Sequence, residues 1–229
     1  MKSSDKQRCT SQLFERESRI GTVTGVILAG GDSSRMKSNK ALLPYRGEFF
    51  IKLIHRQMAS IFPEVIVVTR TPEPYRSLSF RTVPDIHPGK CSLAGIHSGL
   101  VHSVTRHIFV VACDMPDLNG KLIRRIATRA GHGDAVIPES PWGLEPLHAV
   151  YSKGCLPAME ETLASENKKI LSCLDRLMVT IVSQEEIARI DPKFSSFRNI
   201  NTPEEYFRIR KEESGTDRDF RRQAMTESA

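Results

Sequence analysis

The chain has 229 residues, of which 39% are hydrophobic and 26% charged, and its formal net charge is +6. This length suits one sizeable domain with its own core. No run approaches the roughly 20 apolar residues of a membrane span, and the amino terminus lacks an apolar signal core, so no membrane association is expected. Positive charge is spread along the chain and aromatic residues are few, so we expect a small polyanionic substrate rather than nucleic acid.

The five cysteines are scattered along the chain and include no C-x-x-C pair. An odd, dispersed set argues against a disulfide framework or a zinc site and favours reduced thiols. We therefore expect a cytoplasmic protein.

The order of predicted elements begins with a polar extension over residues 1–22, which is expected to lie outside the core. A single domain is expected over residues 23–209, followed by a charged tail over residues 210–229. Within the domain, hydrophobic patterns predict strands at 23–28, 64–69, 81–84, 107–113, 134–138, 147–152 and 179–182, and one ending at 199–201. They predict helices at 48–61, 92–104, 119–130, 154–163 and 169–177, and a last helix that begins at Thr202 with a capping box.

Alternation of strands and helices predicts an α/β fold with a mostly parallel central sheet. The stretch at residues 23–44, VTGVILAGGDSSRMKSNKALLP, combines the first strand with a basic loop. Gly30 and Gly31 can bring backbone amides close to an anion, and Arg35 and Lys40 add positive charge. The spacing fits neither the Walker loop nor the dinucleotide fingerprint. We interpret the stretch as a triphosphate-binding loop; the alternative is a glycine turn followed by a solvated basic loop.

Two aspartates follow predicted strands. Asp114 comes directly after the apolar run IFVVAC, and Asp85 comes directly after the strand at 81–84. Open α/β sheets bind ligands at the carboxyl ends of their strands, and Mg²⁺ at a triphosphate is held by one or two carboxylates plus phosphate oxygens. Asp114 is therefore a candidate Mg²⁺ ligand and Asp85 a second candidate carboxylate, the alternative for each being an ordinary turn.

Residues 28–44 resemble the signature LAGGxSxRMxxxKxLLP of the molybdenum cofactor guanylyltransferases, the MobA-like family of nucleotidyltransferases. The run CDMPDL resembles the family's CDxP segment, whose aspartate binds Mg²⁺, and SLAGI resembles the end of its Asp–x–x–G–P–L–A–G–I segment. The resemblance implies a three-layer α/β/α, Rossmann-like nucleotidyltransferase fold. It also implies catalytic roles for Arg35, Lys40 and Asp114, and a nucleotide-binding set made of Leu28, Ala29, Gly30, Gly31, Lys40, Asp85, Gly95 and Asp114.

Two later segments resemble the family's second-substrate side. EPLHAVY at residues 145–151 is similar to Q-P-L-H-A-V-Y, near the pterin-binding side, and NINTP at residues 199–203 is similar to N-x-N-T-P. The resemblance implies that His148, Asn199 and Asn201 serve the second substrate. The alternatives are a hydrogen-bonded core histidine and asparagines that cap the last helix.

The activity implied by the resemblance is transfer of GMP from GTP to molybdopterin, or its molybdenum-loaded form, with Mg²⁺ as cofactor and pyrophosphate as leaving group. Ala29-Gly30-Gly31 favours GTP, because the related cytidylyltransferases read Ala-Ala-Gly there. Transient contact with molybdenum-insertion proteins or target apo-enzymes is also implied. Two alternatives stay open: a cytidylyltransferase or sugar-phosphate nucleotidyltransferase, and a GTP-binding adaptor without turnover, suggested by departures from the signature at Lys37 and Asn39.

Overall fold

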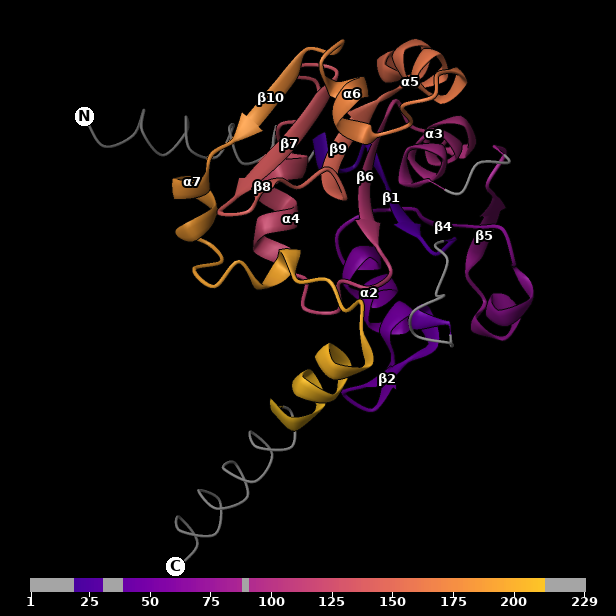
Figure 1. Ribbon diagram of the computed structural model, residues 1–229, viewed down its shortest axis with the longest axis vertical. Helices are drawn as coiled ribbons and strands as arrows, with labels where there is room; N and C mark the ends of the chain where they lie inside the picture. The colour runs from indigo at the N-terminus through magenta and orange to yellow at the C-terminus, as the bar shows by residue number, and fades with distance from the viewer. Residues whose placement is uncertain (1–18, 31–38, 88–90, 213–229) are drawn as a thin grey trace, which may run out of the picture.

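A computed structural model of the chain describes residues 19–30, 39–87 and 91–212. Within these ranges the centre of the molecule is an eight-stranded sheet, which Figure 1 shows as arrows. Its strands are β1 (Val23–Leu28), β4 (Val65–Thr69), β5 (Arg81–Pro84), β6 (His107–Ala112), β7 (Ala135–Ser140), β8 (Gly143–Leu144), β9 (His148–Ser152) and β10 (Val179–Val182). A separate two-stranded sheet pairs β2 (Pro44–Tyr45) with β3 (Glu48–Phe49).

The strand order is β10-β7-β9-β6-β1-β4-β5, and β8 pairs with β7. β1 runs parallel to β4 and β6, β4 to β5, and β10 to β7. β9 is antiparallel to both of its neighbours, β6 and β7. The sheet is therefore mostly parallel, as the sequence predicts, with β9 reversed near its middle and the short β8 antiparallel to β7.

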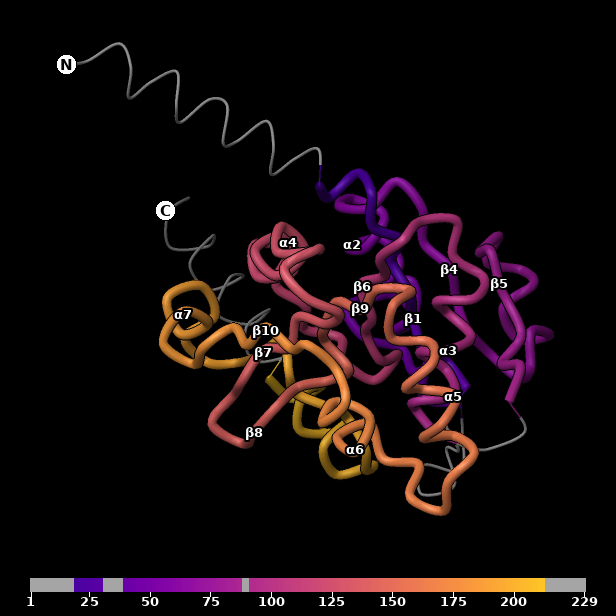
Figure 2. Tube along the Cα trace, turned by 90° about the horizontal axis from the view of Figure 1, so that it is seen from above, coloured from indigo at the N-terminus to yellow at the C-terminus, as the bar shows by residue number. Residues whose placement is uncertain are grey.

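Helices cover both faces of the sheet and make the three layers visible in Figure 2. Apolar side chains of α2 (Phe50–Ala59), α4 (Gly120–Ala127) and α7 (Gln184–Ala188) share one core cluster with the sheet. Those of α3 (Ser92–His102), α5 (Leu156–Ala164) and α6 (Ile170–Leu174) share the cluster on the other face. The short 3-10 helices are η1 (Lys40–Leu42), η2 (Glu73–Leu78), η3 (Lys153–Cys155) and η4 (Ser195–Phe197).

β1 lies inside this sandwich because both of its faces are apolar. Val23 and Ile27 pack into the cluster beneath α2 and α4, whereas Val26 packs on the opposite face beneath α3. A strand buried on both faces of a parallel sheet is typically a nearly continuous apolar run, as in VTGVIL, rather than an alternation of apolar and polar residues. The position of β1 between β4 and β6 places the loop that follows it at the middle of one sheet edge.

The last helix starts as predicted. The Glu205 amide donates to the Thr202 hydroxyl at 3.2 Å, and Glu205 Oε2 accepts from the Thr202 amide at 3.0 Å. This reciprocal pair is a capping box, and it opens a helix that is described over residues 203–212. Glu205 Oε2 also accepts from the Asn201 amide at 2.6 Å, so the cap fixes the residue just before the helix.

Several parts of the chain differ from the prediction: the short strands β2, β3 and β8 were not predicted, and residues 48–49, predicted to start a helix, form β3. Ile20 was expected outside the core, but it is buried in the cluster beneath α2 and α4. Residues 199–201 were expected to end a strand, but they form an irregular segment whose Ile200 amide donates to the Asp114 carbonyl at 2.9 Å. α7 was not predicted, because its five residues are too few to show a helical period.

Candidate active site

A cavity of about 410 Å³ lies at the carboxyl edge of the sheet. β1, β4 and β6 run in one direction, with Leu28 aligned to Val68 on one side and to Ala112 on the other. Residues that follow these strands therefore meet at one place, as expected for ligand sites in open α/β sheets. The lining includes Leu28, Ala29, Gly30, Lys40, Asp85, Gly95, Asp114, Asn199 and Asn201 from the predicted set.

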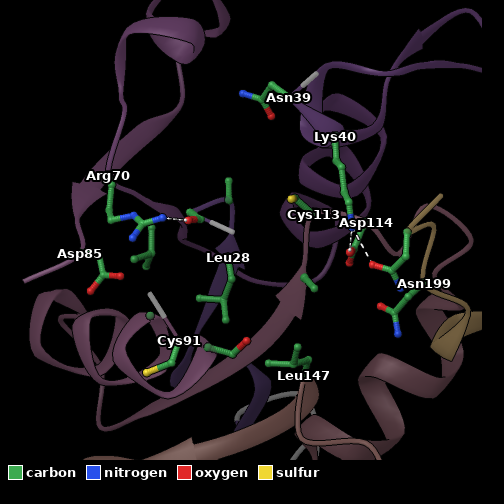
Figure 3. Close-up of a pocket in the computed structure, with 17 residues that line it drawn as sticks. Leu28, Asn39, Lys40, Arg70, Asp85, Cys91, Cys113, Asp114, Leu147 and Asn199 are labelled. Carbon is green, nitrogen blue, oxygen red and sulfur yellow. Dashed lines mark hydrogen bonds and ion pairs between the residues drawn. The ribbon is translucent and has the colours of Figure 1, made fainter. Parts of the chain in front are cut away.

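One side of the cavity holds a compact polar cluster centred on Lys40. The Lys40 ammonium lies 3.2 Å from Asp114 Oδ2 and donates to Asn201 Oδ1 at 2.6 Å (Figure 3). Both side chains of the ion pair are mostly shielded, with 15% and 18% exposed. The Lys40 ammonium thus joins three segments that are far apart in sequence. It keeps the Asp114 carboxylate and the Asn201 amide oxygen directed at the same point.

Asn39 and η1 place Lys40 in the cavity. The Asn39 side chain accepts from the Ala41 amide at 3.1 Å and so caps η1. Its amide nitrogen also donates to the Tyr75 hydroxyl at 3.0 Å, which ties the start of η1 to η2. Burial raises the pKa of Tyr75 to about 12, so this hydroxyl stays protonated at neutral pH.

The other side of the cavity carries Arg70 and Asp85, which lie across from Lys40 in Figure 3. Arg70 follows β4 and donates to the Gly30 carbonyl at 2.7 Å. The Asp85 carboxylate follows β5 and accepts from the Ser98 hydroxyl at 3.1 Å and from the His87 amide at 3.2 Å. Gly30, the first glycine of the predicted triphosphate-binding loop, is therefore held in place by Arg70 from the side of β4.

Cys113 lines the cavity beside Asp114. Burial, together with the neighbouring Asp114 charge, raises the pKa of the Cys113 thiol to about 12. A thiol with this pKa is protonated at neutral pH and is a poor nucleophile. The site is therefore built for holding charged groups in place rather than for covalent catalysis by cysteine.

His148 lies away from the cavity, in the core. Its ring is 0% exposed and is packed edge-on between the rings of Phe109 at 5.2 Å and Phe197 at 5.1 Å. Neither ring nitrogen has a hydrogen-bond partner among the described residues. The role at the second substrate that the resemblance implies would require an accessible ring. The alternative was a hydrogen-bonded core histidine; the position of His148 matches it, but the hydrogen bonds are missing.

Two predicted residues, Gly31 and Arg35, fall outside the described ranges. Other lining residues were not predicted as site residues: Asn39, Val68, Arg70, Cys91, Ser92, Ala112, Cys113 and Leu147. The resemblance alone could have found Leu147, which belongs to the EPLHAVY segment. The sequence gives no signal for Arg70, because its reach to Gly30 depends on β4 being the neighbour of β1.

The donor atoms of the site fit a divalent cation that is shared with a phosphate ligand. Within the described ranges no group of three or more His, Cys, Asp or Glu side chains is arranged to hold a metal ion. Asp114 provides one carboxylate, and Asn201 provides a side-chain amide oxygen; both contact the Lys40 ammonium. Mg²⁺ at nucleotide sites is commonly held by one or two carboxylates, with phosphate oxygens and waters completing the shell.

Comparison with known proteins gives consistent matches. The family model described as "MobA-like NTP transferase domain" matches residues 25–180. The molybdenum cofactor guanylyltransferase of Desulfosudis oleivorans is 37% identical over 188 residues, which cover 81% of this chain and 93% of that protein. The crystal structure of molybdopterin-guanine dinucleotide biosynthesis protein A from Archaeoglobus fulgidus has a TM-score of 0.73 and 28% identity, covering 84% of this chain and 100% of its own.

A Mycobacterium tuberculosis protein, crystallised as a complex with manganese, has a TM-score of 0.52 and 20% identity, covering 71% of this chain and 88% of its own. This likeness supports the fold. As to membranes, no helix in the described part of the chain is both long and apolar enough to cross one.

Proposed function

The chain belongs to the MobA-like NTP transferase family, and we propose that it is a molybdenum cofactor guanylyltransferase. It transfers GMP from GTP to molybdopterin, or to Mo-molybdopterin, and releases pyrophosphate. The product is molybdopterin guanine dinucleotide. The observation that carries the proposal is the position of the Lys40 ammonium, which is held between Asp114 and Asn201. It lies at the edge of the sheet where the predicted triphosphate-binding loop, called the glycine loop below, begins after β1.

The reaction requires alignment and charge neutralisation more than covalent chemistry. A phosphate oxygen of the acceptor attacks the α-phosphorus of GTP, a new P–O bond forms, and the bond between the α-phosphorus and the bridging oxygen breaks. Negative charge grows on the departing pyrophosphate and is stabilised by preorganised donors. Lys40 supplies one such donor. Arg35, which precedes it in the predicted triphosphate-binding loop, supplies a second.

Asp114 and the Asn201 amide oxygen would hold the divalent cation, Mg²⁺ in this proposal. When bound, the cation neutralises charge on the α-phosphate and on the departing pyrophosphate. The Asp114 backbone carbonyl also accepts from the Ile200 amide at 2.9 Å, which holds the segment of Asp114 against the segment that carries Asn201.

Leu28, Ala29, Gly30, Gly31, Asp85 and Gly95 would complete the nucleotide site. Gly95 allows close packing, since a Cβ there would lie 3.2 Å from the Leu28 side chain. Asn199 and Asn201 lie on the Lys40 side of the cavity, where the acceptor would approach. We also place the protein in the cytoplasm, where it would pass the product on through transient contact with molybdenum-insertion proteins or target apo-enzymes.

Calorimetric titration with GTP and with CTP, each with and without Mg²⁺, tests this proposal. We expect Mg²⁺-dependent binding of GTP that is lost in Lys40→Ala and kept in Lys121→Ala, which removes an exposed lysine from α4. Preference for CTP would replace the proposal with a cytidylyltransferase. Equal binding by the two lysine variants would refute the role of Lys40.

A further inference from the structure

The turn between β7 and β8 carries an exposed aromatic side chain that the proposed mechanism does not use. Trp142 is the only tryptophan of the chain, and 73% of it is exposed. Large aromatic side chains bury most of their surface when nothing else determines their position. An indole directed into solvent at a tight turn therefore needs an explanation.

Hydrogen bonds fix the shape of this turn. The Trp142 amide donates to the Ser140 hydroxyl oxygen at 3.1 Å, and the Ser140 hydroxyl donates to Glu145 Oε1 at 2.6 Å. The Glu145 amide donates to the Pro138 carbonyl at 2.9 Å, which closes the base of the hairpin. Gly143 has φ of +119°, a value that side-chain-bearing residues rarely adopt, so the turn is specified by sequence.

A neighbouring loop supports the indole from one side. The Phe194 ring lies 6.3 Å from the Trp142 ring, at 81°, in an edge-to-face contact. Phe194 has φ of +51°, in the left-handed region that is unfavourable for a bulky residue. The residue that contacts Trp142 therefore has a strained backbone conformation. Its ring keeps the indole in a defined orientation, while most of the indole surface faces solvent.

The hairpin stands on the sheet edge that carries the cavity. β9 is antiparallel to both β6 and β7, so β6 and β7 point the same way and their carboxyl ends share an edge. β9 lies between them, as Figure 1 shows, and Leu147 just before it lines the cavity. Two strand spacings of about 4.8 Å put the end of β7 roughly 10 Å from the end of β6, where Asp114 follows.

We propose that Trp142 is a stacking subsite for the pterin ring of the acceptor; this inference rests on the proposed function. The glycine loop, Arg70 and Asp85 follow β1, β4 and β5, so the nucleotide occupies that side of Asp114. The acceptor must bring its phosphate to Asp114 from the remaining side, which is the side of β9 and β7. A pterin is a flat conjugated heterocycle on a short side chain, and indole is a strong stacking partner for such rings.

Acceptor kinetics test this subsite with three variants. We expect Trp142→Ala to raise the KM for molybdopterin about tenfold, the scale of a lost base–aromatic stacking contact, with the KM for GTP unchanged. Trp142→Phe should restore most of the affinity because it keeps a ring face. Phe207→Ala removes an aromatic side chain that is 63% exposed on the last helix and serves as the matched control, with no expected effect.

A binding measurement separates this inference from the proposed function. Calorimetric titration with 6-hydroxymethylpterin reports pterin binding without turnover, and we expect it to be weakened in Trp142→Ala alone. If the wild type makes no dinucleotide but binds the pterin through Trp142, the proposed function fails and the subsite stands. If the wild type turns over while Trp142→Ala leaves both the acceptor KM and pterin binding unaltered, the subsite is refuted; equal losses in Trp142→Ala and Phe207→Ala refute it as well.

Discussion

Replacing His148 should remove part of the acid sensitivity of the fold. Burial of the ring lowers the pKa of His148 from 6.5 to about 3, although the nearby Asp191 charge acts in the opposite direction. The folded state therefore resists protonation while the unfolded state accepts a proton below about pH 6.5. The contribution of His148 to stability is complete above that pH and is lost progressively as the pH falls toward 3.

The size of the effect follows from the separation of the two pKa values. Between pH 6.5 and pH 5 the unfolded chain gains the proton and the folded chain does not, which costs about 2 kcal/mol at roughly 1.36 kcal/mol per pH unit. His148→Leu places an apolar side chain in this apolar site and removes the titration. We expect the wild type to lose about 2 kcal/mol more than the variant between neutral pH and pH 5.

Urea denaturation of both proteins at pH 7.5 and pH 5 measures this difference. His132→Gln, at an exposed position, provides the control and should keep the pH dependence of the wild type. An identical pH dependence in His148→Leu and the wild type would refute the placement of an unprotonated ring in the core. Because His148 lies outside the cavity lining, the folded variant should also keep its kcat/KM within a few-fold; a loss of turnover at intact stability would return His148 to the active site.

Four further substitutions have expected outcomes. Lys40→Ala and Asp114→Asn should each lower kcat/KM by about 100-fold or more, the scale of a lost electrostatic contact in a transition state, with a circular dichroism spectrum like that of the wild type; near-normal turnover would contradict the mechanism. Thr202→Ala should cost about 1 kcal/mol in urea denaturation by removing the helix cap, and no loss would show the cap to be dispensable. Gly133→Ala should destabilise the fold, because φ is +154° and the new Cβ would lie 2.6 Å from the Met178 carbonyl oxygen; unchanged stability would contradict that crowding.

The sequence could predict the parts of the site that depend on local pattern. Asp114 follows the mostly apolar strand β6, and Gly30 follows β1, so the shared edge of a parallel sheet brings them together. The capping box at Thr202 is equally local, because its two partners are three residues apart. Each of these follows from short-range chemistry that a single stretch contains.

Other features depend on contacts between distant segments, which no local pattern contains. The reversed direction of β9 is set by its pairing with β6 and β7. An apolar run in the sequence predicts a buried strand but does not indicate whether that strand is parallel or antiparallel to its neighbours. Asn201 reaches Lys40 across 161 positions of sequence. The burial of Ile20 likewise depends on a cluster beneath α2 and α4 rather than on its polar neighbours in sequence.

The most direct measurement combines the purified protein with GTP, Mg²⁺ and molybdopterin and follows pyrophosphate and dinucleotide together. We expect one pyrophosphate for each molybdopterin guanine dinucleotide formed, with little product when CTP replaces GTP. Binding of GTP without pyrophosphate release after the acceptor is added would contradict the account and identify a nucleotide-binding adaptor, and faster turnover with CTP would contradict the assignment of the base.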